Sequence, residues 1–281
     1  MSRALAFLAA LLAVAGCAEP SPLPPAVPET AVQPDGSPAD SLALRMVDAA
    51  GGSGRVSDEQ GPDGWADVPV VGFDFARGTE EGRRLIRRHL WNRQTGQYRV
   101  DWTAGDTTLV AFFDVGAFDT EQPAGTVYAD GEMLPQSAAA PYLQGAYEGY
   151  INDTYWWLAP TKLFDGGVTR GLAPERDTDS TRVLTLAFDG VGLTPGDRYW
   201  LTADRTTGRL LGWQFLLQGA DEPGPYIAWT GTVAVDTPIG PLPVATRREV
   251  DGAVRLYTDE VWAPPTVPPA AFTDPAWARA E

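Results

Sequence analysis

The sequence predicts a mainly β protein with some α-structure, built as one curved antiparallel sheet (a half-barrel) of about ten or more strands. Short runs rich in β-branched and aromatic residues recur every 10 to 15 residues from about Val70, with Gly and Asp turn signals between them. Most links are of hairpin length, which favours antiparallel pairing. A single aromatic segment, residues 138–159, interrupts this rhythm with helical spacing. One or two helices are therefore expected to cover the concave side of the sheet.

Alternation of apolar and polar side chains defines the individual strands. In one run Tyr98, Val100 and Trp102 alternate with Arg99 and Asp101, so one face of that strand should meet the core. The last two strands should form a hairpin, because Asp-Gly between two such runs is a strong two-residue turn signal. The expected strands are residues 71–75, 85–91, 98–102, 109–113, 126–129, 183–188, 199–203, 211–217, 227–233, 242–248 and 254–262.

The first expected helix precedes the sheet and spans residues 41–50. Its apolar residues are spaced for one helical face, Asp40 or Ser41 can cap its N-terminus, and the glycines that begin at Gly51 can end it. Residues 51–64 should then form a loop.

The second expected helix lies within the aromatic segment. The apolar spacing predicts a helix over residues 142–151. Asn152 and Asp153 should end it, with Asp153 capping a second short piece through Trp157 that stops at Pro160.

Composition excludes several classes of protein. The 281 residues carry 21 basic and 37 acidic side chains, a formal net charge of -16, so a nucleic-acid partner is not expected. Cys17 is the only cysteine and His89 the only histidine, which leaves no intrachain disulfide and no cysteine- or histidine-cluster metal site. No cofactor and no metal are therefore expected.

The N-terminal residues predict a signal peptide and a lipid anchor. A short basic start is followed by eleven apolar residues, 4–14, which are too few to span a bilayer. Small residues then precede Cys17 directly, as in the lipobox of bacterial lipoproteins, so residues 1–16 should be cleaved and Cys17 lipidated. An ordinary cleavage site with a chance cysteine is the alternative. Residues 17–39 are rich in proline and should form an extended tether.

These features predict the domain boundaries and the cellular location of the protein. The folded domain is expected over residues 40–265, with a C-terminal tail over 266–281. By similarity to enterobacterial sorting rules, Ala18 in place of an aspartate after the cysteine implies an outer-membrane lipoprotein facing the periplasm. The inner membrane and the cell surface remain alternatives.

Three motifs carry a family resemblance that covers about residues 70–264. Residues 91–100 (WNRQTGQYRV) resemble an early hairpin in relatives of the outer-membrane lipoprotein carrier and receptor, LolA and LolB. Residues 152–163 (NDTYWWLAPTKL) and 190–200 (GVGLTPGDRYW) are similar to motifs of an uncharacterised bacterial lipoprotein family of that superfamily. The resemblance implies a curved antiparallel sheet whose concave apolar face accepts acyl chains.

Aromatic residues are the candidates for such a groove. An open half-barrel could present them to a ligand, whereas their ordinary role would be to fill the core. Because adjacent helical residues cannot face the same core, one member of the Trp156–Trp157 pair should lie at a rim or interface. The candidates are Trp102, Phe113, Trp156, Trp157, Trp200, Trp213, Phe215 and Trp229.

Polar candidates are fewer. Lys162 is the only lysine in the chain and could anchor an anionic group or form an ion pair with Asp153 or Asp165; chance placement is the alternative. His89 belongs to a basic cluster that could meet lipid head groups or an acidic neighbour, or could simply be a solvated sheet face. The cluster comprises Arg83, Arg84, Arg87, Arg88, His89 and Arg93.

Catalysis has little support in the sequence. His89 has no Ser or Cys partners at a recognised spacing, and neither G-x-S-x-G nor H-E-x-x-H occurs. We therefore expect a non-catalytic protein that binds a hydrophobic small molecule or acyl chain, gated by the 138–159 segment. A protein-interaction module for an envelope partner, its groove filled by its own helices, is the first alternative. An envelope hydrolase with paired carboxylates, such as Asp101 with Asp114, is the second.

Overall fold

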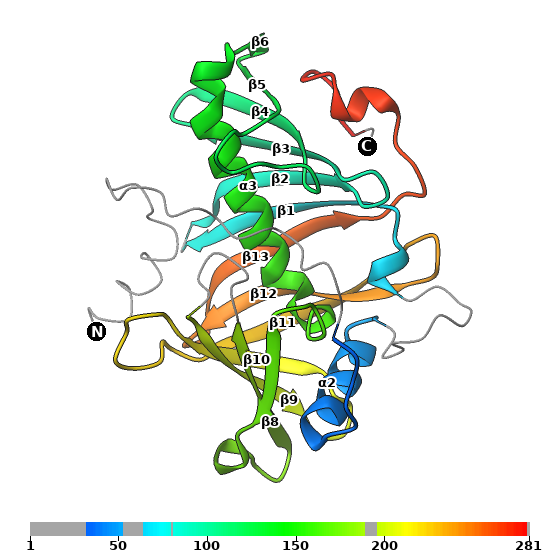
Figure 1. Ribbon diagram of the computed structural model, residues 1–281, viewed down its shortest axis with the longest axis vertical. Helices are drawn as coiled ribbons and strands as arrows, with labels where there is room; N and C mark the ends of the chain where they lie inside the picture. The colour runs from blue at the N-terminus through cyan, green and yellow to red at the C-terminus, as the bar shows by residue number, and fades with distance from the viewer. Residues whose placement is uncertain (1–31, 53–63, 80, 189–195, 280–281) are drawn as a thin grey trace.

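The computed structural model describes residues 32–52, 64–79, 81–188 and 196–279 as one open, curved, thirteen-stranded antiparallel sheet with two α-helices (Figure 1). The mainly β half-barrel predicted from the sequence is confirmed. The helices are α2 (Pro38–Ala49) and α3 (Gln136–Leu158). The strands are β1 (Val70–Thr79), β2 (Gly82–Asn92), β3 (Gln97–Ala104), β4 (Thr107–Asp114), β5 (Thr126–Ala129), β6 (Glu132–Met133), β7 (Val168–Leu172), β8 (Thr181–Phe188), β9 (Arg198–Asp204), β10 (Leu210–Leu216), β11 (Ile227–Val235), β12 (Leu242–Val250) and β13 (Ala253–Trp262).

The order of strands explains how one helix comes to cross the sheet. The sheet runs β6-β5-β4-β3-β2-β1-β13-β12-β11-β10-β9-β8-β7, so the chain starts in the middle at β1 and moves outward to the edge strand β6. Helix α3 then carries the chain over the concave face to the opposite edge, β7 (Figure 1). From there the strands return to β13, which pairs with β1 and joins the two halves.

Helix α3 is continuous, so the predicted break at Asn152 and Asp153 is wrong. The helix runs from Gln136 to Leu158 without interruption. The carboxylate of Asp153 accepts hydrogen bonds from side chains of the sheet and caps no backbone amide, which removes the reason for a break. Pro160 follows the helix in a short 3₁₀ turn, as expected of a proline just beyond a C-terminus.

Helix α2 starts three residues earlier than expected. Ser37, and neither Asp40 nor Ser41, is the N-cap, and its hydroxyl accepts the amide of Asp40 at 3.1 Å. Asp40 points to strand β7 instead, where it pairs with Arg170 at 2.6 Å. The helix ends before Gly51, as predicted.

Every predicted strand is present, and two others, β6 and β7, were not predicted. Both lie at the edges of the sheet, where strands are short and need little apolar alternation. Strand β6 has only two residues, and β7 carries a glycine, Gly171, within its five residues. Neither gives a periodic signal long enough to stand out in sequence.

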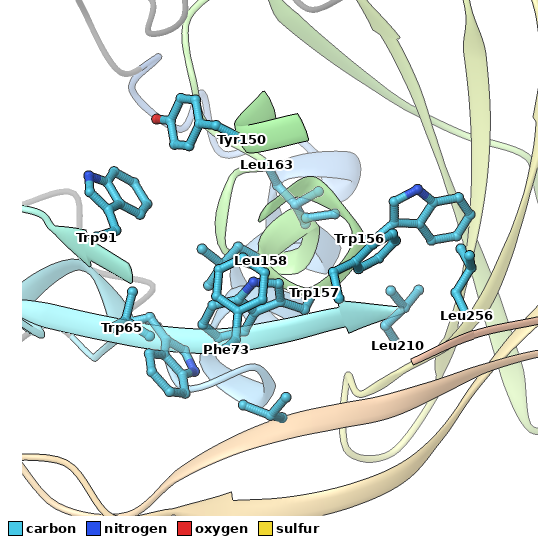
Figure 2. Packing of buried hydrophobic residues seen from close by; sticks show 14 of the residues in the cluster. Trp65, Phe73, Trp91, Tyr150, Trp156, Trp157, Leu158, Leu163, Leu210 and Leu256 are labelled. Carbon is cyan, nitrogen blue, oxygen red and sulfur yellow. The ribbon is translucent and has the colours of Figure 1, made fainter. Parts of the chain in front are cut away.

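The convex face has its own small cover. Residues 266–279, which the sequence analysis assigned to a C-terminal tail, pack on this face. Ala271 and Phe272 of this segment contact Val70 and Leu90 of the sheet. Buried Arg99 holds this segment by donating to three of its backbone carbonyls. The larger core lies on the concave side, between the sheet and the helices (Figure 2).

Candidate functional site

Helix α3 buries side chains on two sides because the sheet curves around it. Trp156 packs against Trp213, with ring centroids 5.0 Å apart, whereas Trp157 packs against Trp65 and Phe73 (Figure 2). Both tryptophans are only 5% exposed. The expectation that one of them lies at a rim or interface is therefore wrong, since a curved sheet offers a core on both sides of the helix.

The C-terminal half of α3 fills its side of the concave face with aromatic rings. Trp213 lies at the centre of this packing, 1% exposed, between Tyr155 and Trp156 of the helix and Trp229 of the neighbouring strand. Phe215 is also buried and touches Trp156. The groove candidates of this half are thus placed as core residues.

Arg248, which the sequence analysis missed, completes the filled half. Its fully buried guanidinium lies 3.9 Å from the centre of the Trp229 ring and donates from Nε to the carbonyl of Trp156 at 2.8 Å, in the last turn of α3. A cation at a helix C-terminus satisfies carbonyls that lack intrahelical partners. Burial lowers the pKa of Arg248 to about 9. Arg248 stands between Arg247 and Glu249 on β12, so nothing in the local sequence distinguishes it from a surface arginine.

The N-terminal half of α3 leaves a cavity of about 290 Å³ against strands β1, β2 and β3. Trp102 is the one groove candidate that lines it, and Tyr142 of the helix lies across from its ring at 6.5 Å. Leu85, 67% exposed, and Tyr142 connect the cavity with solvent. The lining residues are Phe75, Arg77, Leu85, Ile86, Arg87, Val100, Trp102, Thr103, Pro141, Tyr142, Gly145 and Ala146.

A β-bulge shapes the wall of this cavity. Along β1 the register advances two residues, from Phe75 to Arg77, while along β2 it moves three, from Arg87 to Arg84. The extra residue falls at Leu85, whose φ of 51° is rare for a leucine. Consecutive residues 85–87 can therefore all line one cavity, which a regular strand forbids because its side chains alternate between faces.

Small residues of α3 leave the space open. Gly145 faces the cavity, and a β-carbon built on it would meet no atom within 4 Å. Glycine within a helix costs about 1 kcal/mol of helix stability relative to alanine. Its presence at this position therefore lowers the stability of α3 but keeps the cavity free of a side chain.

A buried polar network forms one end of the cavity. Arg87 donates to both oxygens of Asp153, at 2.6 and 2.8 Å. His89 Nε2 lies 3.0 Å from Asp153, and the Tyr98 hydroxyl lies 2.8 Å from His89 Nδ1. Asn152 donates a further hydrogen bond to Asp153. The network ties the C-terminal half of α3 to strands β2 and β3.

The charges of the network follow from its geometry. Burial would raise the pKa of Asp153, but the charge of Arg87 and the bonds from His89 and Arg87 outweigh it, so the pKa lies below its usual value. Burial lowers the pKa of His89, with partial compensation from Asp153. Neutral His89 can donate from Nε2 to Asp153 and accept at Nδ1 from Tyr98, whose own pKa burial raises well above normal. The group thus orients side chains but presents no activated nucleophile.

Lys162 lies apart from this network. Its ammonium is 3.8 Å from Asp165 and forms no ion pair with Asp153. Burial lowers the pKa of Lys162 and raises that of Asp165, and each partner's charge works against that shift. The sequence analysis offered Asp153 and Asp165 as ion-pair partners of Lys162, and in the structure the partner is Asp165.

The basic cluster is divided by strand β2. Arg87 and His89 point to the concave side, whereas Arg88 lies opposite Asp74 and pairs with it at 3.5 Å. Arg83 pairs with Asp259, Arg84 with Glu81, and Arg93 donates to the carbonyl of Trp65. Acidic partners on the same molecule therefore take up most of these charges.

The remaining candidates are dispersed. Trp200 lies opposite Gln214, next to the core pair Leu201 and Trp213, so it faces the convex side, where Arg176 stacks on it. Phe113 is buried against Tyr98 and Tyr147.

The carboxylate pair Asp101 and Asp114 does not form. Asp114 lies opposite Gln97, four residues and therefore roughly 13 Å along β3 from Asp101. Asp101 pairs with Arg99 instead, and Asp114 binds the amides of Gly116 and Ala117.

Two absences concern only the part of the chain that the structure describes. Within it, no cluster of three or more potential metal ligands occurs. No helix in the same residues is long and apolar enough to cross a membrane. The signal peptide, Cys17, residues 17–31 of the tether and residues 190–195 of the third motif lie outside the described residues.

Comparison with known proteins finds similarity in structure alone. No family model and no curated protein matches the chain. A DUF1329 family protein from Desulfovibrio piger aligns with a TM-score of 0.43 and 12% identity, covering 83% of this chain and 95% of its own. An outer membrane lipoprotein-sorting protein domain from Vibrio parahaemolyticus aligns with a TM-score of 0.33 and 8% identity, covering 73% of this chain and 88% of its own. At these TM-scores and identities the two alignments carry no argument about family, ligand or activity.

Proposed function

We propose that the protein binds a hydrophobic ligand, or the acyl chain of a lipid or lipoprotein, in the cavity between α3 and strands β1–β3, and that it does so without catalysis. The cavity itself is the observation that supports this. It holds about 290 Å³, is walled by Phe75, Val100 and Trp102, and reaches solvent beside Leu85. Pockets that are mostly apolar, with a few polar groups at defined places, are typical ligand sites.

Burial of alkyl groups would supply the affinity. Each CH₂ removed from water contributes about 0.8 kcal/mol, which corresponds to roughly a fourfold change in Kd. Affinity should therefore rise steadily with chain length and level off once the chain fills the cavity. In this proposal the N-terminal half of α3, with Tyr142 at its outer edge, acts as the gate.

The proposed setting is the bacterial cell envelope. Lipidated Cys17 would anchor the chain, the proline-rich tether over residues 17–39 would hold the domain away from the bilayer, and the outer membrane facing the periplasm is the favoured location. Cell fractionation tests this location, with the inner membrane and the cell surface as the alternatives.

A second candidate function has a specific observation in its favour. The other half of the concave face is filled by the protein's own aromatic residues, among them Tyr155 and Trp213. A module that uses its filled groove as a rigid scaffold and binds an envelope protein elsewhere would have this construction.

Titration with uncharged alkyl alcohols tests the proposal. The full chain carrying Cys17→Ser has no acyl group of its own and is titrated with hexanol, octanol, decanol and dodecanol by calorimetry. We expect saturable binding that tightens by up to about fourfold per CH₂. Gly145→Leu, which places a side chain in open space, should abolish binding while the protein stays folded. Trp102→Ala should weaken binding, and Trp200→Ala, a matched change on the convex face, should not.

The opposite result is equally clear. If no alcohol binds saturably, and native mass spectrometry of the chain from its own host finds no co-purifying lipid, the ligand-binding proposal is wrong and the interaction module takes its place.

A further inference from the structure

One arginine at the cavity has a buried nitrogen without a hydrogen-bond partner. Arg77 lines the cavity, and its Nε is buried without any hydrogen-bond partner among the described residues. The side chain of Arg77 is only partly buried, but a buried donor without a partner still costs free energy. Burial and the nearby charge of Arg87 both lower the pKa of Arg77.

The nearest carboxylate of the network is already occupied. Asp153 accepts two hydrogen bonds from Arg87, one from Asn152 and one from His89. One aspartate thus balances Arg87 and leaves the charge of Arg77 uncompensated by that network. A second positive group beside a satisfied one, on the wall of an apolar cavity, is complementary to an anion that arrives with an alkyl chain.

We propose that the cavity takes a single-chain amphiphile with a carboxylate head group, which binds the guanidinium of Arg77 while the alkyl chain lies along Phe75, Val100 and Trp102. This inference rests on the proposed function and specifies its ligand class. The planar fork of an arginine matches a carboxylate through paired, charge-assisted hydrogen bonds. The bulge at Leu85 is what brings the two arginines and the apolar wall to one cavity.

A phosphate head group shares this chemistry, so the experiment separates the two. The Cys17→Ser full chain is titrated, below the micelle concentrations, with laurate, dodecyl phosphate, dodecanol and dodecylammonium. We expect laurate to bind at least about tenfold more tightly than dodecanol and dodecylammonium to bind more weakly than either. Tighter binding of dodecyl phosphate than of laurate would overturn the carboxylate and assign the site to a phosphate head group.

Three arginine variants locate the effect. Arg77→Met keeps the length of the side chain and should make laurate and dodecanol bind equally. Arg88→Met removes an arginine from the opposite face of β2 and should keep the tenfold preference. Arg77→Lys keeps the positive charge but lacks the planar guanidinium, so its preference for laurate over dodecanol should be intermediate. This variant also tests the proposal if Arg77→Met proves too unstable to measure.

Failure of this inference is distinguishable from failure of the proposed function. Equal binding of laurate and dodecanol to the unmodified cavity overturns the head-group assignment and leaves acyl-chain binding standing. Absence of binding by all four compounds overturns both.

Discussion

The two halves of the concave face are built from one sheet and one helix, yet one is filled and the other is open. Around the C-terminal half of α3, the rings of Tyr155, Trp156 and Trp213 pack against one another, and Arg248 closes the helix end. Around the N-terminal half, the residues that face strands β1–β3 include Gly145 and leave about 290 Å³ unfilled.

The difference shows that side-chain size along α3 decides where a half-barrel can accept a ligand. The curvature of the sheet provides the same type of surface to both halves. Gly145 and Ala146 at the cavity, and Tyr155 and Trp156 on the filled side, then determine which part is cavity and which part is core. The polar network at Asp153 marks the boundary between them.

The largest expected effect comes from a matched pair of tryptophan substitutions, one in each half. Trp213→Ala should reduce the free energy of unfolding by about 3–5 kcal/mol, as for large-to-small changes in a packed core. Trp102→Ala removes a half-buried cavity wall and should cost far less stability while weakening alkyl binding. Urea denaturation followed by circular dichroism measures both. Equal losses would show that the open half is an ordinary part of the core.

The boundary network should give the next largest effect. Asp153→Asn removes the charge that compensates Arg87 and an acceptor of His89, and should cost about 3 kcal/mol or more, because breaking a buried ion pair leaves one charge uncompensated. Asp251→Asn, an exposed hairpin position with φ of 52° that asparagine tolerates, is the control and should be nearly neutral. The same urea titration compares them, and a neutral Asp153→Asn would mean that the network does not hold α3 to the sheet.

The smallest expected effect is a dependence on pH that originates at His89. Its pKa in the folded protein lies below the 6.5 of the unfolded chain, so below about pH 6.5 the unfolded chain binds a proton that the folded protein does not. The free energy of unfolding should therefore fall as the pH falls from 7.5 to 5.5, by up to about 1 kcal/mol per pH unit. Neighbouring charges on Asp153 and Arg87 stay constant over this range.

A histidine variant isolates that contribution. His89→Gln retains a polar side chain without titrating, so its stability should be lower overall and should change less between pH 7.5 and 5.5. Identical pH profiles for the variant and the unmodified chain would place the dependence on other groups.

Local patterns in the sequence were sufficient for the strands and for the class of fold. Alternation such as Tyr98, Val100 and Trp102 depends only on neighbouring residues, and all three lie on the concave side. The same reasoning failed at Asp153. A local rule predicted that this residue caps a helix, but in the structure its carboxylate binds Arg87 of strand β2, more than sixty residues away along the chain. It also missed Arg77 and Arg248, because nothing nearby in sequence distinguishes them from surface arginines.

The sequence by itself determined a mainly β half-barrel with a helix across it, because periodicity and turn chemistry act over a few residues. Only the tertiary structure decided which half of the concave face is open. That outcome depends on the path of α3 between opposite edges of the sheet and on a one-residue bulge at Leu85, which turns three consecutive side chains toward one cavity. Both arise from pairing between distant segments, which no local pattern records.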